Sequence, residues 1–313
     1  MSGPPVDPAA ERASTPSSEA VICVRGLVKR FGSQTVLDGM NLDVHPGETM
    51  VIMGGSGSGK STFLRCMVGS LTPEEGTIEL FGRNICGLNE DDLNAVRRRF
   101  GILFQSGALF NSMTIAENVA LPLQEHTDLP QGTINIMVNL KLNQVGLYEH
   151  ADKYPSQISG GMKKRAGLAR ALALDPDILF YDEPSAGLDP VTSAEIDQLI
   201  IDLTRKMNVA SVVVTHEMDS AFMIADRMAM LDQGRMLMVD RREAYEDIRD
   251  HPDETLAELD EKGRLIRQFL RGDADGPITR RKAATNYAED LIAGNVTATF
   301  SDPSVQPTRV RKN

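Results

Sequence analysis

Cysteine, positive charge and long apolar runs are all scarce in this sequence. The three cysteines, Cys23, Cys66 and Cys86, are odd in number, widely spaced and not in metal-ligand pairs. A disulfide scaffold or a zinc site is therefore not expected, and the thiols are interpreted as small residues in a reducing compartment. Lys and Arg number 33 against 44 Asp and Glu, which gives a formal net charge of −11. This balance argues against a protein that binds nucleic acid through bulk electrostatics.

No stretch approaches the roughly 20 consecutive apolar residues that a membrane-spanning helix requires. Residues 1–20 also lack the apolar segment of a secretory signal. We therefore expect no membrane span in the chain itself and no nucleic-acid partner.

What is present fits one large α/β domain with attachments, because 41% of the 313 residues are hydrophobic. Aliphatic and β-branched runs predict strands, and they alternate with stretches that predict helices. Such alternation implies a mostly parallel sheet that is covered on both faces. The expected strands are 21–28, 36–44, 48–54, 77–82, 100–105, 177–183, 210–216 and two within 227–240, and the expected helices are 61–70, 92–99, 191–206 and 217–226.

Between residues 111 and 175 the pattern changes, since three helices and no strand are expected there. We predict an inserted helical subdomain at about 106–175 within a domain that covers residues 20–242. The other predicted parts are a disordered lead at 1–19, a helical extension at 243–275 and a mobile polar tail at 276–313.

The strongest motif is a glycine-rich run that follows a predicted strand and opens a predicted helix. It comprises Gly54, Gly55, Ser56, Gly57, Ser58, Gly59, Lys60, Ser61 and Thr62. The glycines let backbone N–H groups turn toward an anion, and the helix N-terminus adds partial positive charge. Lys60 can neutralise the β and γ phosphates of a nucleotide, and the Ser61 hydroxyl can ligate Mg²⁺. The run predicts a phosphate-binding P-loop.

Two further patterns complement the P-loop. The apolar strand 178–181 ends in Asp182, which can hold Mg²⁺, and Glu183, which can polarise an attacking water. Ser159, Gly160 and Gly161 open another helix and form a second potential anion site. Each pattern alone would be explained as a helix start or cap. Since one nucleotide has one γ-phosphate, the second anion site suggests capture of that phosphate from the opposite side.

Six motifs in this order resemble the ATPases of ATP-binding cassette (ABC) transporters across roughly residues 20–242. They are Gly54–Ser61, Gln105, Ser159 to Gly161, Asp182 with Glu183, Gly187 to Asp189, and His216. The resemblance implies the P-loop NTPase fold of an ABC cassette, with an N-terminal antiparallel β part and an inserted helical subdomain. It implies ATP and Mg²⁺ as cofactors, and two cassettes that pair head-to-tail. The signature Ser159 to Gly161 of one copy then closes over ATP on the P-loop of the other.

The remaining roles follow from the same resemblance. Phe31 matches the aromatic that stacks on adenine, although alone it would be interpreted as a core or turn aromatic. Gln105 matches the residue that touches Mg²⁺ and links to the transmembrane partner. Asp189 matches the loop between the two sites, and before Pro190 it can equally serve as a helix cap. His216 matches the histidine that contacts the γ-phosphate, and Glu183 is the expected catalytic base.

Residues 103–130, 158–190 and 268–277 look most like the ATPase of MCE-associated (Mla-type) lipid transport systems. The signature departs from the usual Leu and Gln at Ile158 and Met162, but its Ser and Gly residues are intact. This likeness implies ATP-driven movement of lipid, expected to be phospholipid, through a separate membrane permease. It further implies an MCE-domain partner bound through the permease, and a peripheral place on the cytoplasmic face of the inner (cell) membrane.

Three other interpretations compete with this one. Another ABC importer, for instance of polar amino acids, would use the same chemistry. A soluble ABC ATPase of iron–sulfur assembly is a second possibility, whereas DNA-repair members need long coiled coils or zinc insertions that the sequence lacks. An adenylate-kinase-like enzyme would not explain Ser159 to Gly161. In the extension, a helix is expected to end at Gly272 and to carry an apolar face of Leu265, Ile266, Phe269 and Leu270. Because such a face must be buried, we expect it to contact a second cassette; the alternative is a helix folded back on its own domain.

Overall fold

The computed structural model describes residues 20–280. The predicted lead at 1–19 and most of the predicted tail at 276–313 lie outside these residues. The described part falls into two compact units, residues 20–250 and 251–280. Within 20–280, no helix combines the length and the apolar character that crossing a bilayer demands.

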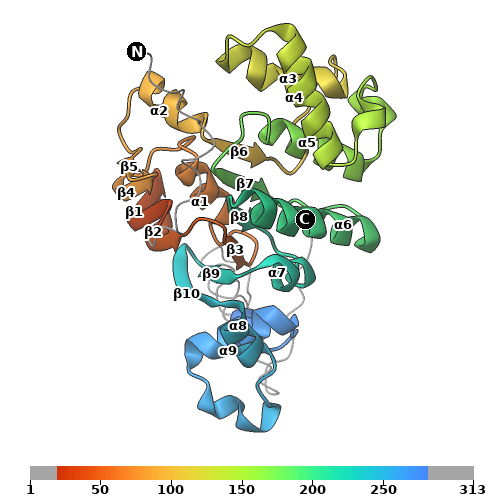
Figure 1. Cartoon of the computed structure of the whole chain (residues 1–313). Helices are drawn as coiled ribbons and strands as arrows, with labels where there is room; N and C mark the ends of the chain where they lie inside the picture. The colour runs from red at the N-terminus through yellow and green to blue at the C-terminus, as the bar shows by residue number, and fades with distance from the viewer. Residues whose placement is uncertain (1–19, 281–313) are drawn as a thin grey trace, which may run out of the picture. The chain divides into compact units, whose positions relative to one another are not determined.

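The first unit contains two sheets and the helices that pack on them (Figure 1). The six-stranded sheet has the order β10-β9-β3-β8-β7-β6, and every neighbouring pair is parallel except β10 with β9. Its strands are β3 (Thr49–Gly54), β6 (Phe100–Leu103), β7 (Ile178–Asp182), β8 (Ala210–Val214), β9 (Arg227–Asp232) and β10 (Arg235–Arg241). The antiparallel sheet has the order β2-β1-β4-β5 and consists of β1 (Ile22–Phe31), β2 (Gln34–Val44), β4 (Glu75–Leu80) and β5 (Arg83–Asn84). The predicted combination of a mostly parallel sheet with an N-terminal antiparallel part is confirmed.

The core explains why the central strands are so apolar. Every residue of β3 and β8 is buried, so both faces of the sheet are covered. Alternate residues such as Met50 and Val212 share a core with Phe63 of α1, and that core continues into the antiparallel sheet. Helices α6 and α7 contact β8 and β3. The bounds are α1 (Lys60–Met67), α2 (Glu90–Arg97), α6 (Pro190–Met207) and α7 (Met218–Ile224).

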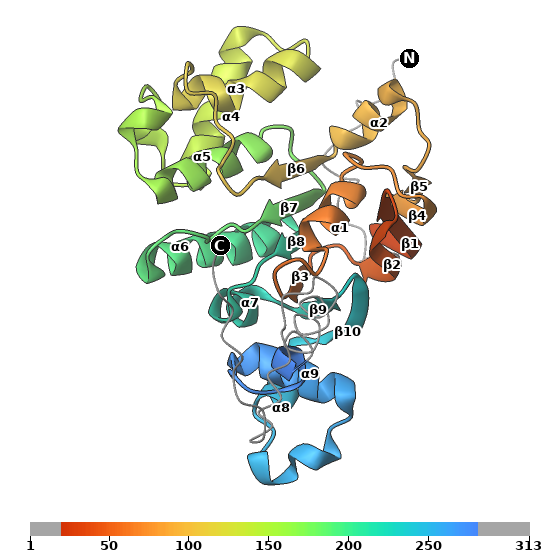
Figure 2. The same ribbon diagram turned by 180° about the vertical axis from the view of Figure 1, so that it is seen from behind.

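The segment expected to be helical forms a bundle of α3, α4 and α5, which lie together in both views (Figures 1 and 2). Thr114 begins α3 with a reciprocal capping box to Glu117, because its hydroxyl accepts the Glu117 N–H and its own N–H donates to the Glu117 carboxylate. Helix α5 also packs on β6 and so joins the bundle to the parallel sheet. The bounds are α3 (Ile115–His126), α4 (Gln131–Gln144) and α5 (Gly160–Ala171), with 3₁₀ turns at Tyr148–His150 and Pro155–Gln157.

Helix α8 (Arg242–Arg249) closes the first unit by packing on β9 and β10. The second unit contains a 3₁₀ turn (Asp253–Glu258) and α9 (Glu261–Arg271). Helix α9 ends at Gly272, the predicted stop, where the backbone φ is 69°. Three residues of its predicted apolar face are buried within the single chain: Leu265, Ile266 and Leu270. Burying them therefore needs no second copy, and the expected contact with a second cassette stays a prediction.

Candidate active site

The end of β3 and the loop after it contain positions that only glycine fits. Gly54 has a φ of 150°, and a Cβ there would lie 2.2 Å from the carbonyl oxygen of Leu231. Gly59 has a φ of 106° and is the N-cap of α1, so the helix begins at Lys60. The exposed Ser61 and the half-buried Thr62 follow in the first turn. The N–H groups at a helix start, together with glycines that leave the loop free of Cβ atoms at these positions, form a cradle for an anion.

Lys60 folds back over this loop. Its Nζ donates to the carbonyl oxygens of Gly54 at 2.8 Å and Gly55 at 3.1 Å. Burial lowers the pKa of Lys60, while the nearby carboxylates of Glu183 and Asp182 oppose this shift. The P-loop lysine and the two acids at the end of β7 therefore form one electrostatic cluster.

The same cluster includes His216, which follows β8, the strand between β3 and β7. Its Nδ1 lies 2.8 Å from Oε1 of Glu183. Burial raises the pKa of Asp182, and the neighbouring Glu183 raises it further, against the cations Arg65, Lys164 and Lys60. Asp182 is thus a carboxylate whose negative charge the protein compensates only in part.

The signature forms a second cluster. Ser159 caps α5 by accepting the Met162 N–H at 3.3 Å. Gly161 lies against α6, since a Cβ on it would be 2.4 Å from Cγ2 of Thr192. The hydroxyl of Thr192 donates to Asp189 at 2.6 Å, and the Thr192 N–H donates to it at 3.0 Å. These two hydrogen bonds lower the pKa of Asp189. The signature and the Asp189 loop therefore form one packed unit.

The signature residues Ser159 to Gly161 do not bond to the P-loop within one copy. Across residues 20–280, no hydrogen bond or ion pair joins the signature to the P-loop, and Ser159 and Gly160 are exposed. Gln105 is exposed in the loop after β6. The ring of Phe31 is also outside the P-loop cluster: 49% of the residue is exposed, and Nζ of Lys29 lies 5.2 Å from the ring centroid.

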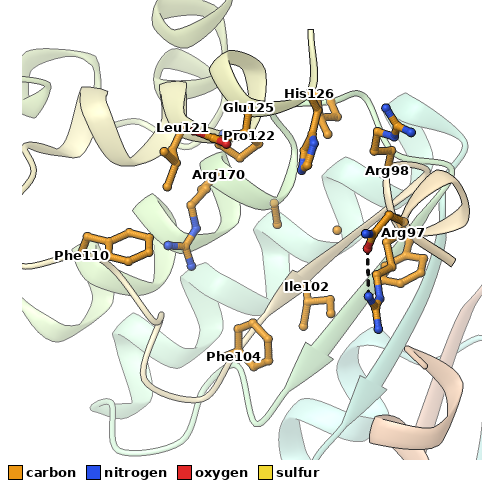
Figure 3. Close-up of a pocket in the computed structure, with 15 residues that line it drawn as sticks. Arg97, Arg98, Ile102, Phe104, Phe110, Leu121, Pro122, Glu125, His126 and Arg170 are labelled. Carbon is orange, nitrogen blue, oxygen red and sulfur yellow. Dashed lines mark hydrogen bonds between the residues drawn. The ribbon is translucent and has the colours of Figure 1, made fainter. Parts of the chain in front are cut away.

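A pocket of about 460 Å³ lies beside the loop that carries Gln105 (Figure 3). Phe104 and Phe110 of this loop line it together with the α3 residues Leu121, Pro122, Glu125 and His126. The guanidinium of Arg170 on α5 donates to the carbonyl oxygens of Ala108 at 2.8 Å and Gly107 at 3.1 Å. The pocket wall is therefore tied to the helix that begins with the signature.

Comparison with known proteins decides the family. The "ABC transporter" family model matches residues 37–186. The chain is 40% identical over 264 residues to the MlaF protein of Escherichia coli K12, named an intermembrane phospholipid transport system ATP-binding protein, and the match covers 84% of this chain and 93% of that one. The chain belongs to the ATP-binding subunits of ABC transporters. It is thus an ATP-binding cassette, and its ATPase activity in driving transport follows from that membership.

Other relatives and solved structures agree with this cassette assignment. MlaF of Haemophilus influenzae is 39% identical over 275 residues, which cover 88% of this chain and 99% of that one. The Mkl protein of Mycobacterium leprae, named a probable ribonucleotide transport ATP-binding protein, is 42% identical over 269 residues and covers 85% and 74%. The dimeric post-hydrolysis cassette MJ0796 bound to ADP and Pi superposes with a TM-score of 0.65 at 31% identity, over 71% of this chain and 98% of that one.

Sequence reasoning missed one residue that contacts the P-loop cluster, Lys164. Only 5% of Lys164 is exposed, and its Nζ donates to the backbone carbonyl oxygen of Glu183 at 2.8 Å. A signal was present in the sequence, because Lys164 lies three residues after Gly161 and four before Leu168, on a helix face that is otherwise small and apolar. A lysine on a buried helix face requires a partner.

Proposed function

We propose that the chain is the ATP-hydrolysing subunit of a transporter that moves phospholipid through a separate membrane permease of an MCE-associated, Mla-type system. The observation that carries this proposal is the extent of the match to MlaF, which covers 93% and 99% of the two proteins compared. Similarity over nearly the whole length includes the surfaces that face a transport partner as well as the nucleotide site.

The P-loop cluster supplies the chemistry. The N–H groups of the loop and Lys60 bind the phosphates of ATP, with Thr62 in the same turn. Phe31, which is exposed in this structure, is the residue we assign to stack on adenine. Water attacks the γ-phosphorus, the bond to the β–γ bridging oxygen breaks, and the water proton passes to the carboxylate of Glu183. His216 supports that carboxylate through the 2.8 Å contact.

The oxygen ligands at this site fit Mg²⁺. Asp182 is a half-buried carboxylate whose pKa is raised mainly by burial, so a divalent cation would relieve its uncompensated charge. Ser61, in the first turn of α1, and Gln105, in the loop after β6, would complete the protein ligands. Bound Mg²⁺ supplies charge neutralisation on the phosphate oxygens.

A second copy completes each site. Ser159 and Gly160 are exposed, and the signature makes no hydrogen bond or ion pair with the P-loop of its own chain within residues 20–280. In a head-to-tail dimer the signature of one copy would close over ATP on the P-loop of the other, as the dimeric state of MJ0796 suggests. Asp189, packed against the signature through Thr192, would connect the two sites.

The pocket of Figure 3 supports the proposal of a permease partner. Phe104 and Phe110, in the loop that also carries Gln105, line this pocket and are 45% and 50% exposed, so an apolar segment of the permease can insert there. We place the cassette peripherally on the cytoplasmic face of the inner membrane, with an MCE-domain lipid-binding protein joined through the permease. The expected cargo is therefore a lipid that this protein delivers or accepts.

Ribonucleotide transport is the second candidate, because the Mkl relatives carry that name at 42% identity. The match covers only 74% of that protein, which makes it the weaker guide. Purification of the chain with its permease in detergent, followed by mass spectrometry and transfer assays in proteoliposomes, separates the two. We expect bound phospholipid and ATP-dependent phospholipid transfer that Glu183→Gln abolishes. Stimulation of the ATPase by ribonucleotides without phospholipid transfer would contradict the proposal, as would a chain that associates with no membrane protein.

A further inference from the structure

Lys164 links two functional motifs that are far apart in the sequence. It lies one turn after Gly160 in α5, and its Nζ donates to the carbonyl oxygen of Glu183 at 2.8 Å. Only 5% of Lys164 is exposed. A buried ammonium group loses its water, so its place is fixed by the few acceptors that remain.

The backbone of Glu183 needs such support. Its φ is 50°, in the left-handed region that residues other than glycine rarely adopt. Its N–H donates to the carbonyl oxygen of Val214 on β8 at 2.9 Å, while its own carbonyl accepts Lys164 and, at 3.3 Å, the N–H of Ala186. The parallel sheet thus holds one side of Glu183, and the signature helix holds the other.

The carboxylates that act on Lys164 also belong to the region around Glu183. Burial lowers the pKa of Lys164, and the carboxylates of Asp182, Glu183 and Glu217 act on its ammonium group to oppose that shift. The ammonium group therefore sits among the acids of the catalytic cluster while its side chain rises from the helix that carries the signature.

We propose that Lys164 is a positioning residue that fixes the Glu183 peptide for hydrolysis and couples it to the signature at the start of the same helix. This inference rests on the proposed function, since it assigns the attacking water to Glu183. The signature acts on the partner's ATP, whereas Glu183 acts on the ATP of its own P-loop. Helix α5 and Lys164 therefore connect the two sites of a dimer by a route separate from Asp189.

The test is Lys164→Met in the full-length chain, with steady-state ATPase kinetics. We expect kcat to fall by about 10- to 100-fold, the cost of a misplaced catalytic group, while the KM for ATP changes by less than about twofold. Lys164→Gln is the second variant in case Lys164→Met folds poorly. Its side chain is one atom shorter than lysine but remains polar, so its kcat should lie between those of wild type and Lys164→Met. Lys141→Met is the matched control, because Lys141 of α4 is 6% exposed and forms its ion pair with Asp175 rather than with Glu183. Its kcat per folded molecule should be unchanged.

A second measurement distinguishes positioning from structural support. In a Glu183→Gln background, Lys164→Met should still form the ATP-dependent dimer, measured by size-exclusion chromatography with light scattering. A lost dimer, or a KM that rises in step with the fall in kcat, would overturn the positioning role. A kcat within twofold of wild type in both Lys164 variants would also overturn it, while leaving the proposed function intact. Undiminished turnover in Glu183→Gln alone would instead refute the proposed function.

Discussion

The two clusters of the cassette differ in how complete they are. In the P-loop cluster, Lys60, Asp182, Glu183 and His216 already interact within one chain. In the signature cluster, Ser159 and Gly160 are exposed, and the packed contacts run to the Asp189 loop. The surroundings of their acids differ as well, because burial raises the pKa of Asp182 whereas hydrogen bonds from Thr192 lower the pKa of Asp189.

This difference assigns different tasks to the clusters. The P-loop cluster holds acids that the protein compensates only in part, which suits a site that receives a cation and a nucleotide. The signature cluster is a pre-formed, well-bonded surface that suits docking onto another molecule. One cluster carries the chemistry, and the other presents an anion-binding helix start to a second copy.

The largest expected effect is in the P-loop cluster. Glu183→Gln removes the base while keeping the size of the side chain, so turnover should fall by about 10²- to 10⁴-fold. ATP binding should persist because Lys60 and the loop are untouched, and an ATP-bound dimer should accumulate. Single-turnover hydrolysis and equilibrium ATP binding measure the two effects, and turnover near the wild-type rate would remove Glu183 from the mechanism.

A smaller effect is expected in the signature cluster. Gly161→Ala adds a Cβ 2.4 Å from Cγ2 of Thr192, so α5 must shift away from α6. We expect about tenfold lower ATPase activity, with unchanged ATP binding by the monomer. The second change Thr192→Ser removes that methyl group but keeps the hydroxyl that donates to Asp189, and it should restore activity.

Gly132→Ala in α4 is the control for this pair, because a Cβ at Gly132 meets nothing within 4 Å. Its activity should match wild type. If the double variant stayed as impaired as Gly161→Ala, the close packing of the signature on α6 would not be the cause.

The smallest effects concern stability of the nucleotide-free chain. A folded pKa above the ordinary 3.8 of Asp means that ionised Asp182 destabilises the fold, a cost present at pH 7 that disappears as pH falls toward 3.8. Asp182→Asn should therefore raise the melting temperature by a few degrees at pH 7, and this gain should vanish near pH 4. The depressed pKa of Asp189 has the opposite sign, so its contribution is lost only as pH falls through a value below 3.8.

Asp189→Ala should accordingly melt below wild type at pH 7, and still do so near pH 4. Thermal melts of both variants at the two pH values check the contrast. Parallel pH responses would show that the acids of the two clusters have similar environments.

The sequence predicted the parts of the site that are encoded locally. The P-loop depends on glycines at fixed spacing and on a strand before a helix, and Asp182 and Glu183 end an apolar strand. The contacts of Lys164 and Gly161 depend instead on how α5 packs against β6 and α6, which no local pattern specifies. Strand β5 has only two residues, Arg83–Asn84, too few to produce a pattern.

We propose above that each ATP site is built from two copies of the chain. A heterodimer of Lys60→Ala and Gly160→Asp, purified through two different tags, tests it directly by its ATPase rate. If sites are shared, one site carries both lesions and the other carries none, so the heterodimer should keep up to half of the wild-type rate while both mutant homodimers are inactive. If each chain contains its own complete site, both sites carry a lesion, and a heterodimer as inactive as the homodimers would contradict the account.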